Sequence, residues 1–265
     1  MPGAAASELF SLDGRVVVVT GAGSGLGRCM ARGCASAGGH VVCADIDPET
    51  AEATSTEIAA ESGRASWVRV DVADEGSVAA TFEQVAESHG RVDVAFCNAG
   101  TSDTFKRVDQ MPLAEWDEIL AVNLTGVFLC VKHAVRQMIK AGQGKLVLTA
   151  SVWGEVGSSL APVPAYAAAK GGVVNLTREL ALELIPLGIT TNAISPGFFE
   201  TNLGRDRDAP AGLLESLLER AVEMSPMKRI ADPERIQGTA IYLASAASDL
   251  VNGHVLTIDG GLTAY

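Results

Sequence analysis

Aromatic residues are scarce in this chain of 265 residues: they make up 5% of it, whereas apolar residues of all kinds make up 48%. The core must therefore be built mainly from aliphatic side chains, alanine and glycine, as in layered α/β proteins. Basic residues are also in deficit, since 20 Lys and Arg stand against 32 Asp and Glu, for a formal net charge of −12. An acidic surface of this kind repels nucleic acids and anionic lipids, so we expect neither as a partner.

Metal, membrane and secretion signals are weak as well. The five cysteines are scattered and form no CxxC pair or Cys/His cluster, so we expect no metal site. A membrane-spanning helix needs an apolar run of about 18 residues or more, and we expect none here. Residues 1–13 lack the basic and apolar regions of a signal peptide, so we expect a flexible N-terminal tail there and a cytoplasmic protein.

Short β-branched apolar runs alternate along the chain with longer segments of helical periodicity. Continuous Val and Ile runs indicate strands buried on both faces, which is typical of parallel sheets. We predict an α/β, Rossmann-type doubly wound fold in a single domain over residues 14–265, with a seven-stranded parallel sheet flanked by helices. Residues 200–229 interrupt the rhythm and are predicted to form a helical lid. The strands are predicted at 15–20, 40–45, 65–70, 92–97, 145–150, 189–195 and 254–258, and helices at 49–61, 75–88, 113–141, 165–186 and 233–245.

Residues 20–27 read TGAGSGLG and lie between the first predicted strand and a helix. Glycines allow a tight turn whose backbone can approach a pyrophosphate, and the N-terminus of the following helix offers free N–H groups to that anion. The glycine spacing is GxxxGxG rather than GxGxxG. The position between strand and helix nevertheless favours a dinucleotide site over an ordinary turn. The expected contacts are Gly21, Ser24, Gly25, Leu26 and Gly27.

Asp45 ends the second predicted strand and indicates which dinucleotide binds. A carboxylate there accepts hydrogen bonds from the ribose hydroxyls of the adenosine half and repels a 2′-phosphate. Neither Ser24 nor Ile46, where a cation could attract that phosphate, is basic. The sequence therefore predicts NAD in preference to NADP, with Asp45 and Ile46 beside the ribose. Asp47 is the competing carboxylate, but Pro48 after it is typical of a helix start.

Several predicted strands end in glycine, proline or a short polar residue. In open parallel sheets, ligands bind outside the carboxyl ends of the strands. These strand ends therefore predict one long cleft. The residues that carry this prediction are Gly21, Asp45, Asp71, Asn98, Ala99, Gly100, Ser151, Pro196 and Gly197.

Tyr166 and Lys170 have i, i+4 spacing at the start of a predicted helix, so they share one face. A free tyrosine has a pKa of about 10, and a nearby ammonium lowers that pKa so that the phenol can act as an acid or base. This spacing alone is common by chance. Ser151 strengthens it, because it ends the fifth predicted strand at the same rim and its hydroxyl can hydrogen-bond a substrate oxygen.

Together these motifs resemble the short-chain dehydrogenase/reductase family, in its common single-domain branch. They span nearly the whole chain, and in this order they are highly specific. The matching segments are TGAGSGLG at 20–27, Asp71-Val72, Asn98-Ala99-Gly100, Asn123 within VNLTG, Ser151, YAAAK at 166–170, PGFFET at 196–201 and IDGG at 258–261.

The resemblance implies a role for each position. Tyr166 is expected to be the general acid/base, and Ser151 to orient the substrate. Lys170 is expected to bind the nicotinamide ribose and to lower the pKa of Tyr166, while the backbone of Asn123 holds a water that links Lys170 to solvent. The resemblance also implies a homotetramer. Further cofactor contacts are implied at Asp71, Val72, Asn98, Ala99, Gly100, Pro196, Gly197, Phe199 and Thr201.

The substrate side departs from the family pattern. The interval from Ser151 to Tyr166 is about two residues longer than usual, and we place the extra length on a loop at residues 157–162. The substrate contacts expected in addition to Ser151 and Tyr166 are Trp153, Ser158 and Phe198.

The sequence therefore predicts an NAD-dependent oxidoreductase that interconverts a small secondary alcohol and a ketone by hydride transfer. Two alternatives stand beside it: a non-catalytic NAD-binding regulator, and a lyase- or epimerase-type relative. The intact set of Ser151, Tyr166 and Lys170 argues against a regulator, which needs no acid/base. Chain length and glycine spacing argue against a lyase or epimerase. The substrate and the reaction direction are not encoded in these motifs.

Overall fold

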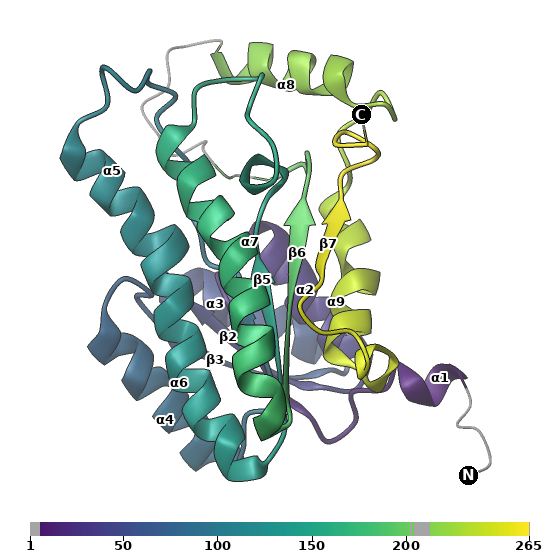
Figure 1. Cartoon of the computed structure of the whole chain (residues 1–265). Helices are drawn as coiled ribbons and strands as arrows, with labels where there is room; N and C mark the ends of the chain where they lie inside the picture. The colour runs from purple at the N-terminus through teal and green to yellow at the C-terminus, as the bar shows by residue number, and fades with distance from the viewer. Residues whose placement is uncertain (1–5, 202, 204–212, 265) are drawn as a thin grey trace.

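The structure is a computed structural model that describes residues 6–201, 203 and 213–264. Seven strands form one sheet in the order β3-β2-β1-β4-β5-β6-β7, and all neighbouring strands run parallel (Figure 1). The predicted Rossmann-type fold is confirmed. The strands are β1 (Val16–Thr20), β2 (His40–Asp45), β3 (Arg64–Arg69), β4 (Val94–Cys97), β5 (Gly144–Thr149), β6 (Ile189–Pro196) and β7 (Val255–Ile258).

The central strands are buried on both faces, as their continuous apolar runs predict. In β1, Val16 and Val18 belong to the core on one face of the sheet, and Val17 and Val19 belong to the core on the other. Alternate side chains of a strand point to opposite faces, so a sheet of this composition needs a helix layer on each side.

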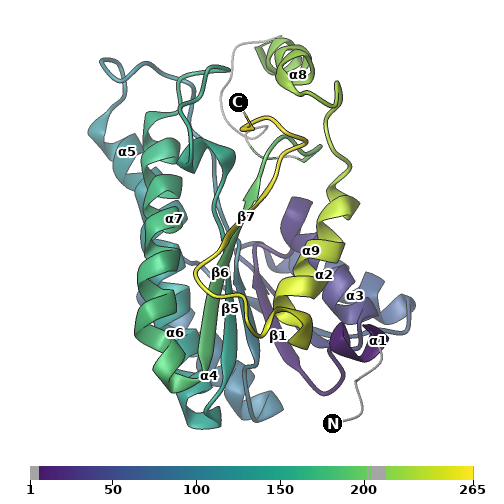
Figure 2. The same cartoon turned by 45° about the vertical axis from the view of Figure 1, so that its right-hand side comes forward.

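Helices supply both layers. α4, α6 and α7 pack on one face of the sheet, and α2, α3 and α9 pack on the other (Figure 2). The predicted helix bounds agree with the observed ones to within a residue or two, except that the helix predicted at 233–245 begins as a 3₁₀ turn, Pro233–Ile236, before α9. The longer helices are α2 (Gly25–Ser36), α3 (Pro48–Ala60), α4 (Glu75–His89), α5 (Leu113–Leu120), α6 (Gly126–Ala141), α7 (Pro164–Leu184), α8 (Leu213–Met224) and α9 (Gln237–Ala244).

α5, a π-helical turn at Ala121–Thr125 and α6 form one continuous helix with the predicted bounds, Leu113–Ala141. Its most apolar window has a mean hydropathy of 1.5, so by length and composition it could cross a membrane, which the sequence expectation overlooked. Half of that window is buried inside the protein, where α6 packs against β4, β5 and α4. In this fold the helix is a core element, and burial against the sheet accounts for its apolar composition.

Residues 6–13 are not the flexible tail that the sequence suggested. A short helix, α1 (Ala6–Leu9), precedes Leu12, which is fully buried in the core that includes α2. The apolar side chain of Leu12 fixes this segment to the domain, and a lone anchor of that kind has no periodicity to reveal it. Residues 1–5 of the expected tail lie outside the described residues.

The segment 200–229 is closed at its base by contacts between its two ends. Phe199 and Ala231 form a parallel β-bridge, and the Glu200 N–H donates to the Ala231 carbonyl at 2.9 Å. Between these ends, α8 lies above the carboxyl ends of β6 and β7 (Figure 1). The predicted lid thus contains a helix, although residues 202 and 204–212 lie outside the described part of the chain.

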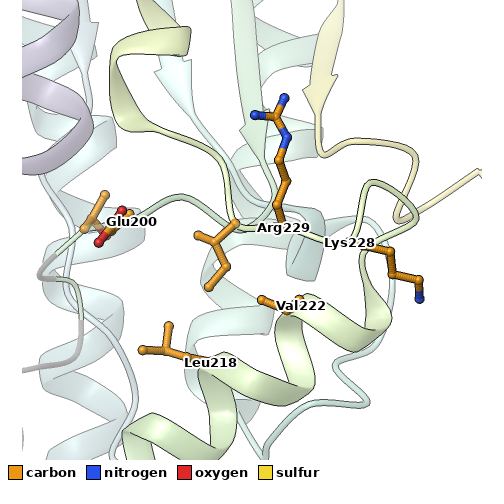
Figure 3. Close-up of a pocket in the computed structure, with 7 residues that line it drawn as sticks. Glu200, Leu218, Val222, Lys228 and Arg229 are labelled. Carbon is orange, nitrogen blue, oxygen red and sulfur yellow. The ribbon is translucent and has the colours of Figure 1, made fainter.

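A small hollow of about 360 Å³ lies beside α8 (Figure 3). Leu218 and Val222 of α8 line it, together with Glu200 from the loop after β6. Lys228 and Arg229 also belong to its wall, but their charged ends extend away from Leu218 (Figure 3). The charged groups of this hollow therefore do not converge on a common point.

Candidate active site

A cavity of about 680 Å³ lies at the carboxyl ends of the strands and is covered on one side by α8. Its volume falls within the range of roughly 300–1,000 Å³ that small-molecule sites occupy. Every predicted cofactor residue belongs to its wall, so the strand ends do form one continuous cleft. The four predicted catalytic residues also line it: Asn123, Ser151, Tyr166 and Lys170.

The turn between β1 and α2 has a backbone that only glycine adopts easily. Gly21 and Gly25 have φ angles of 68° and 51°, in the left-handed region. A Cβ added at Gly27 would overlap the carbonyl oxygen of Gly21. Ser24 is the N-cap of α2, but its side chain caps no N–H, so the first turn of α2 keeps donors for an anion. These features fit a pyrophosphate.

Asp45 ends β2 in the wall of the same cavity. Its carboxylate accepts a hydrogen bond from the Gly23 N–H at 2.8 Å and another from the Asp47 N–H at 3.1 Å, so the glycine turn and Asp45 hold each other. Ile46, beside it, is 57% exposed and lines the cavity. The Asp47 carboxylate instead accepts from the Glu49 N–H at the start of α3, as expected for a helix-start residue.

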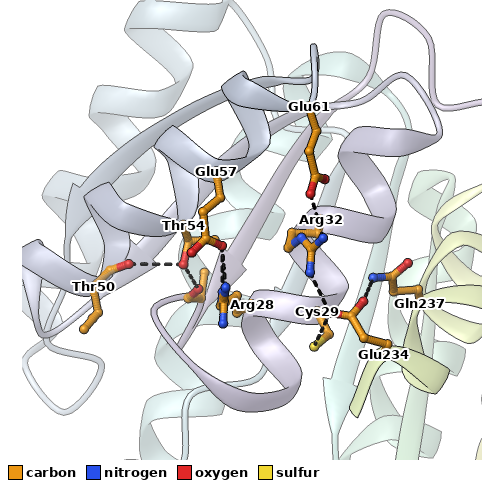
Figure 4. A network of polar contacts seen from close by, with 10 residues as sticks. Arg28, Cys29, Arg32, Thr50, Thr54, Glu57, Glu61, Glu234 and Gln237 are labelled. Atoms are coloured by element: carbon orange, nitrogen blue, oxygen red, sulfur yellow. Dashed lines mark hydrogen bonds and ion pairs between the residues drawn. The ribbon is translucent and has the colours of Figure 1, made fainter. Parts of the chain in front are cut away.

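Ion pairs connect α2 to α3 and to the segment just before α9 (Figure 4). Arg28 of α2 pairs with Glu57 of α3 at 2.6 Å. Arg32 of α2 pairs with Glu61 of α3 at 2.7 Å and with Glu234, just before α9, at 2.6 Å. Each pair is partly exposed and contributes little stability alone, but together they fix the direction of the helix whose first residues line the cavity. Sequence spacing could not reveal these partners, because they lie on different elements.

Lys170 is 2% exposed and lies one turn after Tyr166 on α7. Its Nζ donates to the Thr149 carbonyl at 2.7 Å and lies 5.5 Å from the centre of the Tyr166 ring. Burial lowers the pKa of Lys170 to about 8, because low-dielectric surroundings disfavour the ammonium. The proton on Lys170 is therefore held less tightly than that of an exposed lysine.

The pKa of Tyr166 is raised to about 12, the opposite of the lowering expected from Lys170. Burial is the largest cause, a hydrogen bond from the Ser151 hydroxyl opposes it, and the nearby Asp103 carboxylate raises the pKa further. Lys170 does not reverse the balance, since its ammonium bonds the Thr149 carbonyl instead of the phenol oxygen. The expected lowering of the Tyr166 pKa was therefore wrong for the protein without a bound cofactor.

Asp103 is a site residue that sequence reasoning missed. Its side chain is fully buried, lines the cavity, and accepts a hydrogen bond from the backbone N–H of Tyr166 at 3.0 Å. The N-cap of α7, Val163, makes no side-chain cap, so Asp103 serves the start of α7 from a remote segment. It lies 63 residues before Tyr166 in a loop without periodicity, which left no signal to find it.

Ser151 follows β5 and begins the short 3₁₀ turn Val152–Gly154, where its Oγ accepts from the Trp153 N–H at 3.2 Å. This turn packs directly on α7. A Cβ added at Gly154 would lie 2.6 Å from the carbonyl oxygen of Lys170. The glycine therefore allows the segment that carries Ser151 to approach the catalytic face of α7.

Asn123 is fully buried in the π-helical turn between α5 and α6. Its side chain donates to the carbonyls of Thr101 at 2.9 Å and Ile119 at 3.0 Å, and accepts from the Thr101 N–H at 3.2 Å. The side-chain amide thus holds the segment after β4 in place. This agrees with a role in which Asn123 acts through its backbone, where a π turn alters the helical hydrogen-bond pattern.

The far end of the cavity, beyond Ser151, is apolar. The rings of Trp153 and Phe198 meet edge to face with their centres 5.9 Å apart, and both residues line the cavity as predicted. Leu217 and Ala221 of α8 complete this end. The helical periodicity of α8 was visible in the sequence, but its position over the catalytic residues was not.

The loop between β5 and α7, which contains the interval from Ser151 to Tyr166 that is longer than usual, contacts α8. Ser158, which was predicted to contact the substrate, is not among the described residues that line the cavity, and its contact with a substrate stays a prediction. Its hydroxyl donates to the Ala161 carbonyl at 2.8 Å and shapes the loop itself. Arg220 of α8 donates to the Ser159 carbonyl at 3.0 Å, and Leu160 is the loop residue that reaches the cavity.

Known proteins resemble this chain in sequence and in fold. A family model described as enoyl-(acyl carrier protein) reductase matches residues 21–263. Cis-4-hydroxycyclohexanecarboxylate dehydrogenase from Sinomonas cyclohexanicum is 40% identical over 250 residues, 94% of this chain and 97% of that protein. A short-chain type dehydrogenase/reductase structure from Mycobacterium marinum has a TM-score of 0.92 at 34% identity, covering 97% of this chain and 99% of that one. A gluconate 5-dehydrogenase from Burkholderia cenocepacia, in complex with NADP and tartrate, has a TM-score of 0.90 at 34% identity, covering 98% and 100%.

The chain belongs to the short-chain dehydrogenase/reductase family, which confirms the resemblance drawn from its motifs. It is an oxidoreductase of the alcohol dehydrogenase and ketone reductase kind, and it works with a nicotinamide cofactor. These relatives are dehydrogenases or reductases by name, which favours that reading over a regulator, a lyase or an epimerase.

Proposed function

We propose that this protein interconverts a secondary alcohol and a ketone by NAD-linked hydride transfer, with Tyr166 as the general acid/base. One observation carries the proposal: Ser151, Tyr166 and Lys170 line the same cavity as the glycine-rich turn, and Ser151 hydrogen-bonds Tyr166. This arrangement puts a proton donor, Tyr166, in the wall of the same cavity that can hold a dinucleotide.

In the reducing direction, Tyr166 donates its phenolic proton to the carbonyl oxygen, and the Ser151 hydroxyl holds that oxygen in place. The raised pKa keeps Tyr166 protonated near neutral pH, so the phenol is ready to donate. In the oxidising direction, Tyr166 must first lose its proton. When bound, the oxidised cofactor supplies the hydride acceptor and a positive ring charge that favours the phenolate.

Lys170 and Asn123 support proton movement in this proposal. Lys170 binds the nicotinamide ribose and, with its pKa near 8, exchanges protons more readily than an exposed lysine. The backbone of Asn123 holds a water that connects Lys170 to solvent. The buried π-helical turn supports this role, because it places Asn123 in the same wall as Lys170.

The cofactor is proposed to be NAD rather than NADP. Asp45 would accept hydrogen bonds from the adenosine ribose hydroxyls and would repel a 2′-phosphate. The adjacent Ile46 offers no cation to offset that repulsion. The gluconate 5-dehydrogenase structure holds NADP, so the choice must be argued from the residues of each chain.

We further propose that α8 acts as a lid that excludes water during hydride transfer. Two features support this proposal. Leu217 and Ala221 of α8 already line the cavity, and the β-bridge between Phe199 and Ala231 holds together the chain before and after the segment that contains α8.

A homotetramer and a cytoplasmic location are also proposed. Exposed apolar side chains on the outer helix layer, such as Phe128 on α6 and Leu182 on α7, support subunit contacts. The small residues at the start of α7 support it less than expected, because Gly172 packs against Leu124 of the same chain. Light scattering on a sizing column tests the assembly directly.

The proposed cytoplasmic location is supported by the five cysteines, which are free and buried, as is common in a reducing compartment.

The proposed chemistry is tested by following nicotinamide absorbance with a panel of secondary alcohols and ketones and with NAD(H) or NADP(H). We expect turnover with NAD(H) and at least about tenfold lower efficiency with NADP(H). Ser151→Ala should lower kcat by about 100-fold, because the reacting oxygen loses a hydrogen-bond donor. No turnover with either nucleotide would contradict the function, and an NADP preference would contradict the role of Asp45.

A further inference from the structure

The loop after β4 carries Asp103 into the active site and is anchored on both sides of that residue. Before Asp103, the Asn123 side chain donates to the Thr101 carbonyl at 2.9 Å and accepts from the Thr101 N–H at 3.2 Å. After Asp103, the carboxylate of Glu115 on α5 accepts a hydrogen bond from the Thr104 hydroxyl. These contacts hold the Asp103 side chain at a fixed place in the cavity wall.

The same loop passes close to the catalytic residues. A Cβ added at Gly100 would lie 2.8 Å from Asn123 Oδ1 and 3.7 Å from Lys170 Nζ. Glycine at this position therefore allows the loop to approach Asn123 and α7 closely. As a result, Asp103 from the loop and Tyr166 and Lys170 from α7 line one cavity.

A hydrogen bond ties Asp103 to the backbone of Tyr166. The fully buried carboxylate accepts from the Tyr166 N–H at 3.0 Å. Tyr166 is the third residue of α7, and the first N–H groups of a helix have no partner within the helix. The oxygen of an asparagine side chain could accept the same bond. The hydrogen bond therefore accounts for the position of Asp103, whereas the negative charge has a separate effect.

The charge of Asp103 acts on the phenol of Tyr166. Burial is the largest cause of the raised Tyr166 pKa, the Ser151 hydrogen bond opposes it, and the Asp103 carboxylate raises the pKa further. The other charged side chains among the described lining residues are Lys170 of α7, Glu118 of α5, and Asp45 and Asp71 at the predicted cofactor site.

From these contacts we infer that Asp103 is a positioning residue, whose carboxylate fixes the backbone of Tyr166 and sets the pH range in which Tyr166 accepts a proton from an alcohol. The inference rests on the hydride transfer proposed above, because it concerns the acid/base of that reaction. In the reducing direction, the carboxylate keeps the phenol protonated and ready to donate. In the oxidising direction, it moves the loss of the phenol proton to higher pH, so alcohol oxidation needs more alkaline conditions.

Asp103→Asn separates the two effects, because it removes the charge and keeps an oxygen that can accept from the Tyr166 N–H. The measurement is kcat for alcohol oxidation with NAD from about pH 6 to about pH 10, which rises as Tyr166 loses its proton. We expect the rising limb to move to lower pH by about one unit, with the maximal kcat within about threefold of wild type.

Asp103→Ala removes both the charge and the hydrogen-bond acceptor. We expect the same movement of the rising limb and, in addition, a maximal kcat about tenfold below that of Asp103→Asn, because the Tyr166 N–H loses its partner. The Kd for NADH should stay within about twofold of wild type in both variants, since the glycine-rich turn is untouched.

Asp109→Asn is the matched control for the loss of charge. Asp109 lies in the same loop, but its side chain is 56% exposed and pairs with Arg107. This variant should keep the wild-type pH profile and kcat, because solvent screens a charge at an exposed position.

The outcomes separate the inference from the proposed function. A rising limb of Asp103→Asn at the wild-type pH, or an equal movement in Asp109→Asn, would overturn the role of the Asp103 charge. An equal loss of kcat in Asp103→Asn and Asp103→Ala would overturn positioning through the hydrogen bond. In these cases wild-type turnover leaves hydride transfer intact. No turnover of any secondary alcohol or ketone by wild-type protein that binds NADH would overturn the proposed function and the inference with it.

Discussion

The predicted cofactor site begins with a turn that depends on backbone geometry, whereas the predicted substrate site is built from side chains of several segments. The turn after β1 depends on φ angles that glycine adopts, and the Gly23 N–H is tied to Asp45. At the other end, Trp153, Phe198 and Leu217 meet from three separate segments.

The difference explains why the sequence predicted the residues of the cofactor end more completely than those of the substrate end. Backbone geometry is written locally, as glycines at fixed spacing before a helix. A side-chain wall depends on which remote segments come together, and its residues are apolar like any core position. Variants at each end should therefore affect different measurements.

The largest separation of the two ends is expected from Gly154→Ala. The added methyl would press on the Lys170 carbonyl and move Ser151 away from α7, so kcat should fall by about 100-fold. NADH affinity, measured by fluorescence titration, should change little, because the glycine turn after β1 is untouched. Gly157→Ala is the matched control on the same loop, since a Cβ there meets nothing within 4 Å. Equal loss in both variants would contradict the packing argument.

Lys170 lies where the two ends meet, and its burial predicts a pH-dependent stability. Its pKa is about 8 in the folded protein against 10.5 for the free group, so between these values the unfolded state binds more protons and stability rises with pH. Relative to Lys170→Met, the wild-type free energy of unfolding should rise by about 2 kcal/mol from pH 8 to 10.

Urea unfolding at several pH values measures this difference. Lys140→Met, at an exposed position on α6, should follow the wild type. Parallel curves for wild type and Lys170→Met would show that burial does not shift the Lys170 pKa.

A smaller effect, confined to the cofactor end, is expected from Ile46→Arg. An arginine at this exposed position beside Asp45 would attract a 2′-phosphate and raise the ratio of NADP to NAD efficiency by about tenfold. Ile46→Gln is the neutral control and should change the ratio far less. The preference among alcohols should stay constant in both variants. A change in alcohol preference would show that the two ends are not independent.

Most of the fold could be predicted from the sequence because its signals are periodic. Continuous apolar runs marked the strands, and the helix at Leu113–Ala141 was placed at its observed bounds. Leu12 was missed because a single apolar anchor in a short segment forms no pattern. Strand ends followed by glycine or short polar residues brought the cofactor residues into one cleft, since parallel strands end at the same edge of a sheet.

The candidate site was less complete where tertiary contacts decide it. Asp103 reaches Tyr166 from a loop far away in the sequence. Ser158 was predicted to contact the substrate, and that contact stays a prediction, since the hydroxyl bonds within its own loop. The pKa of Tyr166 was expected to fall because the i, i+4 spacing places Lys170 nearby, but spacing says nothing about burial or about Asp103.

The central claim is that Tyr166 performs the proton transfer while the glycine-rich turn binds the cofactor independently. Tyr166→Phe tests it most directly, measured for alcohol oxidation by nicotinamide absorbance and for NADH binding by fluorescence titration. We predict that kcat falls by about a thousandfold or more while the Kd for NADH stays within about twofold of wild type. Turnover close to that of the wild type would contradict the claim.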